Sequence, residues 1–263
     1  MMVVFSLPHL FGFLLAFARV GAVVALLPVP ALKRAPAAVR IVLALALTLL
    51  TAPWWPSPEL SLNGPYGAAG LGWRLAGWML AEATFGVAVG LVVAILADAF
   101  SLAAQVLGLQ AGYGYASTID PNTDADSGIL LILAQWSAWL LFLALGFDRV
   151  VVRALALSFS AQPAGEFAFS PASRAALLEL TGTLFSTAVR LALPLVALLA
   201  LVDLALAVFG KLNAQLQLLS LAFPAKMLVA LGVLGLGFPV WARVFEGLAR
   251  QAQATLMRVA AGV

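Results

Sequence analysis

Residues 73–107 read WRLAGWMLAEATFGVAVGLVVAILADAFSLAAQVL, and this stretch decides the fold class of the chain. About 20 apolar residues let a helix cross a hydrocarbon core roughly 30 Å thick, and this stretch is longer, with few charges and no proline. Gly86 and Gly90 lie within it, at the spacing of small residues that lets two helix backbones approach closely. The stretch therefore predicts a long membrane helix packed against a second helix.

Other apolar segments lie on both sides of this helix, and loops rich in glycine, proline and polar residues separate them. The expected helices are residues 5–27, 39–51, 129–145, 150–159, 177–209 and 216–238, and the expected loops are residues 59–72, 108–128 and 160–173. The first basic residue is Arg19, whereas a cleavable signal peptide begins with a basic region, so we expect the first helix to be retained. The pattern predicts an all-α chain.

The composition of the whole chain requires an apolar environment. Hydrophobic residues make up 64% of the chain and charged residues 10%, against about 45–50% and about 25% in ordinary soluble domains. A soluble fold of this size cannot bury so much apolar surface, so the chain is predicted to be an integral membrane protein.

The composition also excludes two classes of site. The basic residues of the chain are few and scattered, which excludes a nucleic-acid-binding surface. It has no cysteine, which excludes disulfides and thiolate metal sites.

The sequence contains no recognisable catalytic or cofactor-binding motif. His9 is its single histidine, and a metal site needs three or four ligands, so we interpret His9 as a packed or interfacial side chain. Gly210 and Lys211 do not form a P-loop, because Leu212 stands where serine or threonine would bind magnesium. We expect no enzymatic activity and no cofactor.

Charged residues inside the apolar segments are further candidates for function. They are Arg19, Arg74, Glu82, Asp98, Arg190, Asp203 and Lys226. A charge at the centre of a bilayer costs on the order of 2.5–3.5 kcal/mol, so these side chains are expected to face protein, water or lipid headgroups. Two interpretations stay open: an ion or proton pathway, and inter-subunit pairing or snorkelling, with more weight on the second. Buried pairs that fix neighbours are expected at Arg19, Asp98, Asp203 and Lys226.

The loop at residues 108–128 is the strongest functional candidate. Its glycines allow an irregular backbone, which membrane depth tolerates only where the backbone is buried in protein or lines a water-filled cavity. Tyr113, Tyr115 and Ile119 supply bulky side chains, and aspartates keep one end of the loop hydrated. On composition alone, a functional loop and an ordinary connection are equally supported.

The C-terminal segment, residues 241–263, is predicted to be an amphipathic helix. One face carries apolar residues at steps of three and four, namely Trp241, Phe245, Leu248, Ala252, Leu256 and Val259. The other face carries Arg243, Arg250 and Arg258. Such a helix suits a membrane surface or a groove in a partner.

Residues 108–121, GLQAGYGYASTIDP, resemble the Gly-x-Gln-x-Gly-x-x-x-Ala-x-x-x-Asp-Pro signature of the flagellar biosynthetic protein FliR family. The resemblance extends along nearly the full chain. Further matching pieces are Arg19, Leu27-Pro28, residues 33–36, residues 141–146, Ser158-Phe159, Leu193-Pro194, Asp203-Leu204 and Phe223-Pro224. The chain departs from the family at Lys211 and Ala214, where arginine and proline are common, so the resemblance does not extend to the tip of the C-terminal hairpin.

The resemblance implies the R subunit of a type III export gate, which assembles with P and Q subunits into a helical channel for unfolded flagellar proteins. It implies tilted helical hairpins, with a P-like part at residues 1–190, a Q-like hairpin at residues 191–240 and the tail at residues 241–263. It also implies a place in the bacterial inner membrane at the flagellar basal body. The B-type switch subunit of the same apparatus is a further implied partner.

In that family the glycine-rich loop helps to plug the closed pore, which favours a functional loop here. The plug residues that the resemblance implies are Gly108, Gln110, Gly112, Tyr113, Tyr115, Ile119, Asp120 and Pro121. Subunit packing or buried charge is expected of Arg19, Gly86, Gly90, Asp98, Asp203 and Lys226. The alternative function is a subunit of a small-solute permease, which needs two related halves with broken helices, and Pro194 and Pro224 are the single hint of these.

Overall fold

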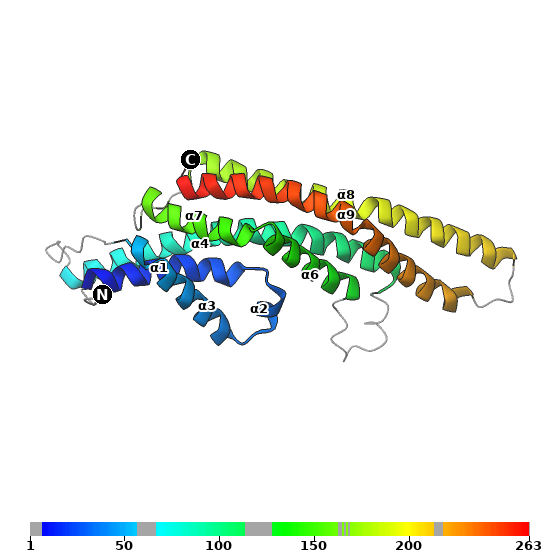
Figure 1. The fold of residues 1–263 in the computed structure, drawn as a ribbon, viewed down its shortest axis with the longest axis horizontal. Coiled ribbons are helices and arrows are strands. Elements are labelled where there is room, and N and C mark those ends of the chain that lie inside the picture. The colour runs from blue at the N-terminus through cyan, green and yellow to red at the C-terminus, as the bar shows by residue number, and fades with distance from the viewer. Residues whose placement is uncertain are drawn as a thin grey trace. The chain divides into compact units, whose positions relative to one another are not determined.

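All regular secondary structure in the described part of the chain is helical (Figure 1). The computed structural model describes residues 7–56, 67–113, 128–162, 165, 167, 169–212 and 218–262. The helices are α1 (Leu7–Leu26), α2 (Pro30–Arg34), α3 (Ala37–Leu50), the 3-10 helix η1 (Ala52–Trp54), α4 (Gly67–Ala111), α6 (Ile129–Ala144), α7 (Phe147–Ala161), α8 (Pro171–Leu212) and α9 (Leu218–Ala261). These residues include no strand, so the predicted all-α fold is confirmed.

Several of these helices are long and apolar enough to cross a membrane. There are four such helices among the described residues, in α1, α4, α8 and α9, or up to five if α6 and α7 count as one bent span. Gly146 lies between α6 and α7 in the left-handed conformation, with φ +65°, which residues with a Cβ rarely adopt. The chain is therefore an all-α membrane protein, as its composition predicts.

Helix α4 is longer at both ends than the sequence predicts. It begins at Gly67 and ends at Ala111, so the expected loops at 59–72 and 108–128 are wrong for residues 67–72 and 108–111. The glycines that suggested loops are tolerated here, since a helix satisfies its own backbone hydrogen bonds in an apolar environment.

The end of α4 depends on one glycine. Gly112 has φ +86°, and its N–H donates to Leu109 O at 3.2 Å while Tyr113 N–H donates to Gly108 O at 3.0 Å. This pattern is a Schellman motif, which closes a helix with a left-handed glycine just beyond its last residue.

The start of α8 and the course of α9 also differ from expectation. The Ser170 Oγ accepts a hydrogen bond from Ser173 N–H at 3.0 Å, which caps α8 immediately before Pro171 and starts it within the expected loop. Helix α9 runs through Pro224 and Pro239 without a break. The segment from residue 241 is therefore the second half of a long helix. The predicted P-like and Q-like division concerns likeness to other subunits and stays a prediction.

The described chain forms two compact units. Unit 1 contains Met1–Ile95, Gly146–Leu180 and Arg250–Val263, and unit 2 contains Leu96–Leu145 and Thr181–Ala249. Helices α4, α8 and α9 thus contribute residues to both units. In unit 1, α1 lies beside α3, and Val20, Val24 and Ala44 form a buried cluster between them (Figure 1).

In unit 2, the core includes aromatic side chains from α4 and α9. The ring of Phe100 lies 5.4 Å from that of Trp241 and 5.2 Å from that of Phe245, between centroids.

All six apolar residues on the predicted face of the C-terminal helix are buried, while Arg243, Arg250 and Arg258 are exposed. The chain's own residues therefore cover the face that we had expected to meet a membrane surface or a partner groove.

Candidate functional site

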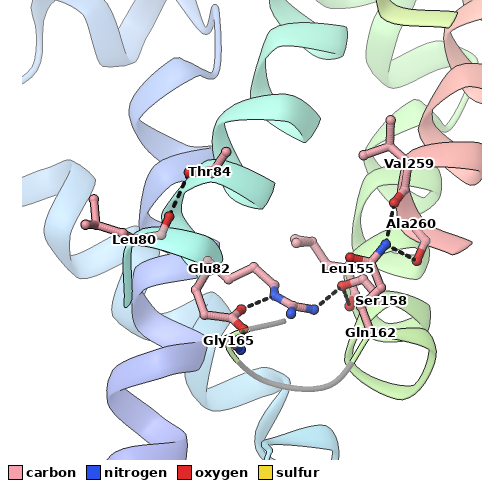
Figure 2. A network of polar contacts seen from close by, with 10 residues as sticks. Leu80, Glu82, Thr84, Leu155, Ser158, Gln162, Gly165, Val259 and Ala260 are labelled. Carbon is pink, nitrogen blue, oxygen red and sulfur yellow. Dashed lines mark hydrogen bonds and ion pairs between the residues drawn. The ribbon is translucent and has the colours of Figure 1, made fainter. Parts of the chain in front are cut away.

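A buried arginine joins three helices of unit 1. Arg19 of α1 is fully buried, and its Nε donates to a carboxylate oxygen of Glu82 in α4, which is also fully buried. Its Nη1 donates to the Ser158 Oγ of α7 at 2.7 Å. Figure 2 shows Glu82 and Ser158 on opposite sides of this network. Since an unpaired buried charge is strongly unfavourable, the pair holds α1 to α4.

Aromatic rings enclose the remaining surface of the same guanidinium. The Arg19 Cζ lies 4.6 Å from the ring centroid of Phe85 and 4.6 Å from that of Phe159. The Arg19 Nη2 has no hydrogen-bond partner, but a desolvated cation over two ring faces gains on the order of 2 kcal/mol from the rings. The charge is thus enclosed by protein groups of unit 1.

The network continues into the segment between α7 and α8. The second carboxylate oxygen of Glu82 accepts a hydrogen bond from Gly165 N–H at 3.0 Å. Gly165 has φ +79°, and a Cβ placed there would lie 1.8 Å from the Trp78 ring, so only glycine fits. The Gln162 Nε2 donates to Val259 O at 2.8 Å, which ties the end of α7 to the end of α9 (Figure 2).

Two glycines let α4 approach α1 closely beside this pair. A Cβ on Gly86 would lie 2.1 Å from the carbonyl oxygen of Arg19, and one on Gly90 would lie 2.7 Å from the Leu26 Cβ. Glu82, Gly86 and Gly90 follow one another at steps of four, so they share one face of α4. The Glu82 carboxylate and the two glycines on this face all contact α1.

A second polar group lies in unit 2 and joins α4, α8 and α9. The Lys226 Nζ of α9 lies 2.9 Å from Asp203 Oδ1 and 3.0 Å from Asp203 Oδ2 in α8. The Gln110 Nε2, in the last turn of α4, lies 3.4 Å from the same Oδ2. The side chain of Lys226 is 12% exposed and that of Asp203 is 45% exposed. The carboxylate is therefore shared by two donors near the surface of this unit.

Tyr113, just beyond the end of α4, contacts α9 next to this ion pair. Its hydroxyl donates to Met227 O at 3.1 Å. Burial raises the pKa of the Tyr113 hydroxyl from its ordinary value of 10.0, so it keeps the proton that it donates. A Cβ on Gly128 would lie 3.5 Å from the Tyr113 Cβ, so the described residues that flank 114–127 are neighbours.

Comparison with known proteins shows which family the chain belongs to. A family model described as bacterial export proteins, family 1, matches residues 10–252. The chain belongs to this family.

Its relatives carry the name flagellar biosynthetic protein FliR. The protein of Pectobacterium carotovorum subsp. carotovorum is 30% identical over 230 residues, which are 85% of this chain and 83% of the relative. The protein of Escherichia coli K12 is 25% identical, over 88% of this chain and 85% of the relative. That of Bacillus subtilis 168 is 26% identical, over 83% of each chain. The predicted resemblance is confirmed, and this member of the export family is a membrane component of flagellar biosynthesis and export.

The residues predicted as a plug fall into two groups in this export protein. Gly108 and Gln110 belong to α4, and Gly112 and Tyr113 form its C-terminal cap. Tyr115, Ile119, Asp120 and Pro121 lie outside the described residues. The structure brings Gln110 together with Asp203 and Lys226, which the sequence did not indicate.

The charged residues are placed unequally. Arg19 has a fully buried partner, whereas Asp98 lies at an exposed position of α4, and its packing against a neighbouring subunit stays a prediction. Arg190 is also exposed, and the Arg74 Cζ lies 5.1 Å from the Trp78 ring centroid. Glu82 was predicted to be an intramembrane charge, but its pairing with Arg19 was not predicted, although its spacing of four residues from Gly86 places both on one face. Gln162 and Gly165 carried no signal that could have identified them.

Proposed function

We propose that the chain is a core, non-enzymatic subunit of the flagellar type III export gate. In this proposal it forms a channel with P and Q subunits, and unfolded flagellar proteins pass through that channel. The gate lies in the bacterial inner membrane at the flagellar basal body, where the B-type switch subunit contacts it. Family membership and the names of the relatives support the export role, and the exposed surface of α8 supports a multi-subunit assembly.

The exposed apolar surface of α8 is the observation that supports partner subunits. In an apolar stretch of 18 residues of α8, only 17% of the residues are buried, against 67% in the corresponding stretch of α4. Large exposed apolar side chains occur along the whole length of α8, at Leu178, Phe185, Val189, Leu193, Leu201, Leu204, Val208, Phe209 and Leu212. From Leu178 to Leu212 the helix axis extends about 51 Å. Lipid covers roughly 30 Å across the bilayer, so another apolar surface must cover the rest.

Tilting does not remove this excess. Transmembrane helices tilt by up to about 40°, and at that angle the same stretch still extends about 39 Å along the bilayer normal. Helices of neighbouring subunits are the covering surface that this proposal supplies. A solitary permease chain would leave the excess apolar surface of α8 in water.

The proposed partners are tested by the mass of the complex purified from membranes in mild detergent. We expect the chain to elute with other subunits of the export family, in a particle several times heavier than its own 27.4 kDa plus bound detergent. A stable monomer from the native membrane would contradict the gate, because α8 would then need no protein cover.

The proposed plug is tested by a deletion that spares the described part of the loop. Removing residues 114–119 is expected to make the assembled gate leak ions and small solutes, since this part supplies Tyr115 and Ile119. Efflux of an ion or a small dye from vesicles that hold the complex measures the leak. A matched deletion of residues 59–64, outside the glycine-rich loop, should leave the gate sealed. An assembled 114–119 deletion that stays sealed would contradict the plug.

A further inference from the structure

We propose that a clasp in unit 2 fixes the base of the glycine-rich loop to helices α8 and α9. Its members are Gln110 and Tyr113 at the end of α4, Asp203 in α8, and Lys226 with the carbonyl of Met227 in α9. This assigns Gln110 to positioning the loop rather than to blocking a pore. Asp203 and Lys226 become positioning residues, and their role in gating rests on the export function proposed above.

The clasp contacts one turn of α9 through two independent bonds. The Gln110 amide donates to the carboxylate of Asp203, and the same carboxylate binds Lys226 of α9. The Tyr113 hydroxyl donates directly to the carbonyl oxygen of Met227. Lys226 and Met227 are consecutive in the chain, so both bonds end at the same level of α9. Two attachment points restrict rotation of the α4 end, which a single bond would permit.

The ion pair between Lys226 and Asp203 is the part of the clasp whose loss is expected to disturb the structure most. The Lys226 side chain is only 12% exposed, and a largely buried ammonium needs a carboxylate beside it. Asp203 is the carboxylate that the structure supplies, at 2.9 Å. The Gln110 amide is adaptable, because it carries both donors and an acceptor, so it can follow either charge at position 203.

The clasp acts on both ends of the segment between α4 and α6. Tyr113 lies against Gly128, the residue that precedes α6. A bond that fixes Tyr113 on α9 therefore fixes the two described flanks of residues 114–127 together. A displacement of α8 or α9 by a neighbouring subunit would move this base, which couples partner contacts to the loop.

The absence of cysteine from the chain makes a direct test possible. Cysteines at Leu109 and Leu228, which are 76% and 70% exposed, would carry spin labels on the two sides of the clasp in the full chain within its membrane complex. We expect a single narrow distance distribution between the labels. Asp203→Lys opposes two ammonium groups and should broaden or shift that distribution.

A double variant in which the two charges are exchanged distinguishes a specific loss of the clasp from a general loss of structure. Asp203→Lys with Lys226→Asp restores opposite charges at the same sites, and Gln110 can accept from the new lysine, so the narrow distribution should return. Asp203→Asn serves if Asp203→Lys does not accumulate, with a smaller broadening expected. Arg190→Gln is the matched control, since it removes an exposed charge from α8 outside the clasp and should change nothing.

Failure of the clasp and failure of the export proposal give different results. An unchanged narrow distribution in Asp203→Lys, or a broad one that the swap does not restore, would overturn the clasp whatever the leak assay shows. A broadened distribution that the swap restores supports the clasp. If that variant nevertheless stays sealed to ions, the clasp stands and the plug role of the loop is what fails.

Discussion

Glu82→Leu is expected to lower the free energy of unfolding of the chain in detergent by about 3–5 kcal/mol. The substitution leaves the fully buried Arg19 guanidinium without its carboxylate. It also removes the acceptor of the Gly165 N–H. Loss of helical circular dichroism during denaturant titration measures the change, and the complex should assemble poorly for the same reason.

Removing both charges distinguishes the cost of an unpaired charge from the loss of a side chain. Arg19→Met with Glu82→Leu replaces the pair by apolar groups of similar volume, which often restores stability, so the double variant should be more stable than Glu82→Leu alone. Arg74→Met, which removes an exposed charge from the same helix α4, is the control and should change stability little. Equal losses in the single and double variants would show that the pair does not hold α1 to α4.

The helices and their membrane character could be predicted from the sequence because apolar length is a local property. The stretch at residues 73–107 predicts a helix by itself, and so does the six-residue apolar face that begins at Trp241. What covers that face could not be predicted, because the chain's own residues bury it. Helix ends were predicted less well. Gly108 and Gly112 look alike in the sequence, yet only Gly112 has a positive φ and ends α4.

Partners of charged residues could not be predicted, because a pairing depends on which helices become neighbours. Arg19 and Glu82 are far apart in the chain, and the sequence indicates only that each needs a partner. The same holds for Gln110, whose place in a family signature suggested the plug, whereas the structure places its amide on Asp203. Loop residues such as Gly165 show their role only through their contacts, here with Glu82 and Trp78.

The close approach of α4 to α1 at Gly86 predicts the second large effect, that of Gly86→Ala. A Cβ at this position would lie 2.1 Å from the Arg19 carbonyl oxygen and 2.7 Å from the Ala22 Cβ. Both obstacles are backbone or the first side-chain atom, so no rotamer change relieves them and α1 must move away from α4. We expect a loss of about 1–3 kcal/mol from overpacking, with a further loss because the displacement also separates Arg19 from Glu82.

The same substitution elsewhere on α4 is its control and should have the opposite sign. Gly77 lies in the same helix with no atom within 4 Å of an added Cβ, so Gly77→Ala should stabilise the chain by roughly 0.5–1 kcal/mol through helix propensity. Thermal unfolding of the two variants in one detergent compares an identical chemical change at a crowded and an open position. If both variants gained stability, α1 and α4 would not be in contact at Gly86, and the pairing of Arg19 with Glu82 would lose its geometric basis.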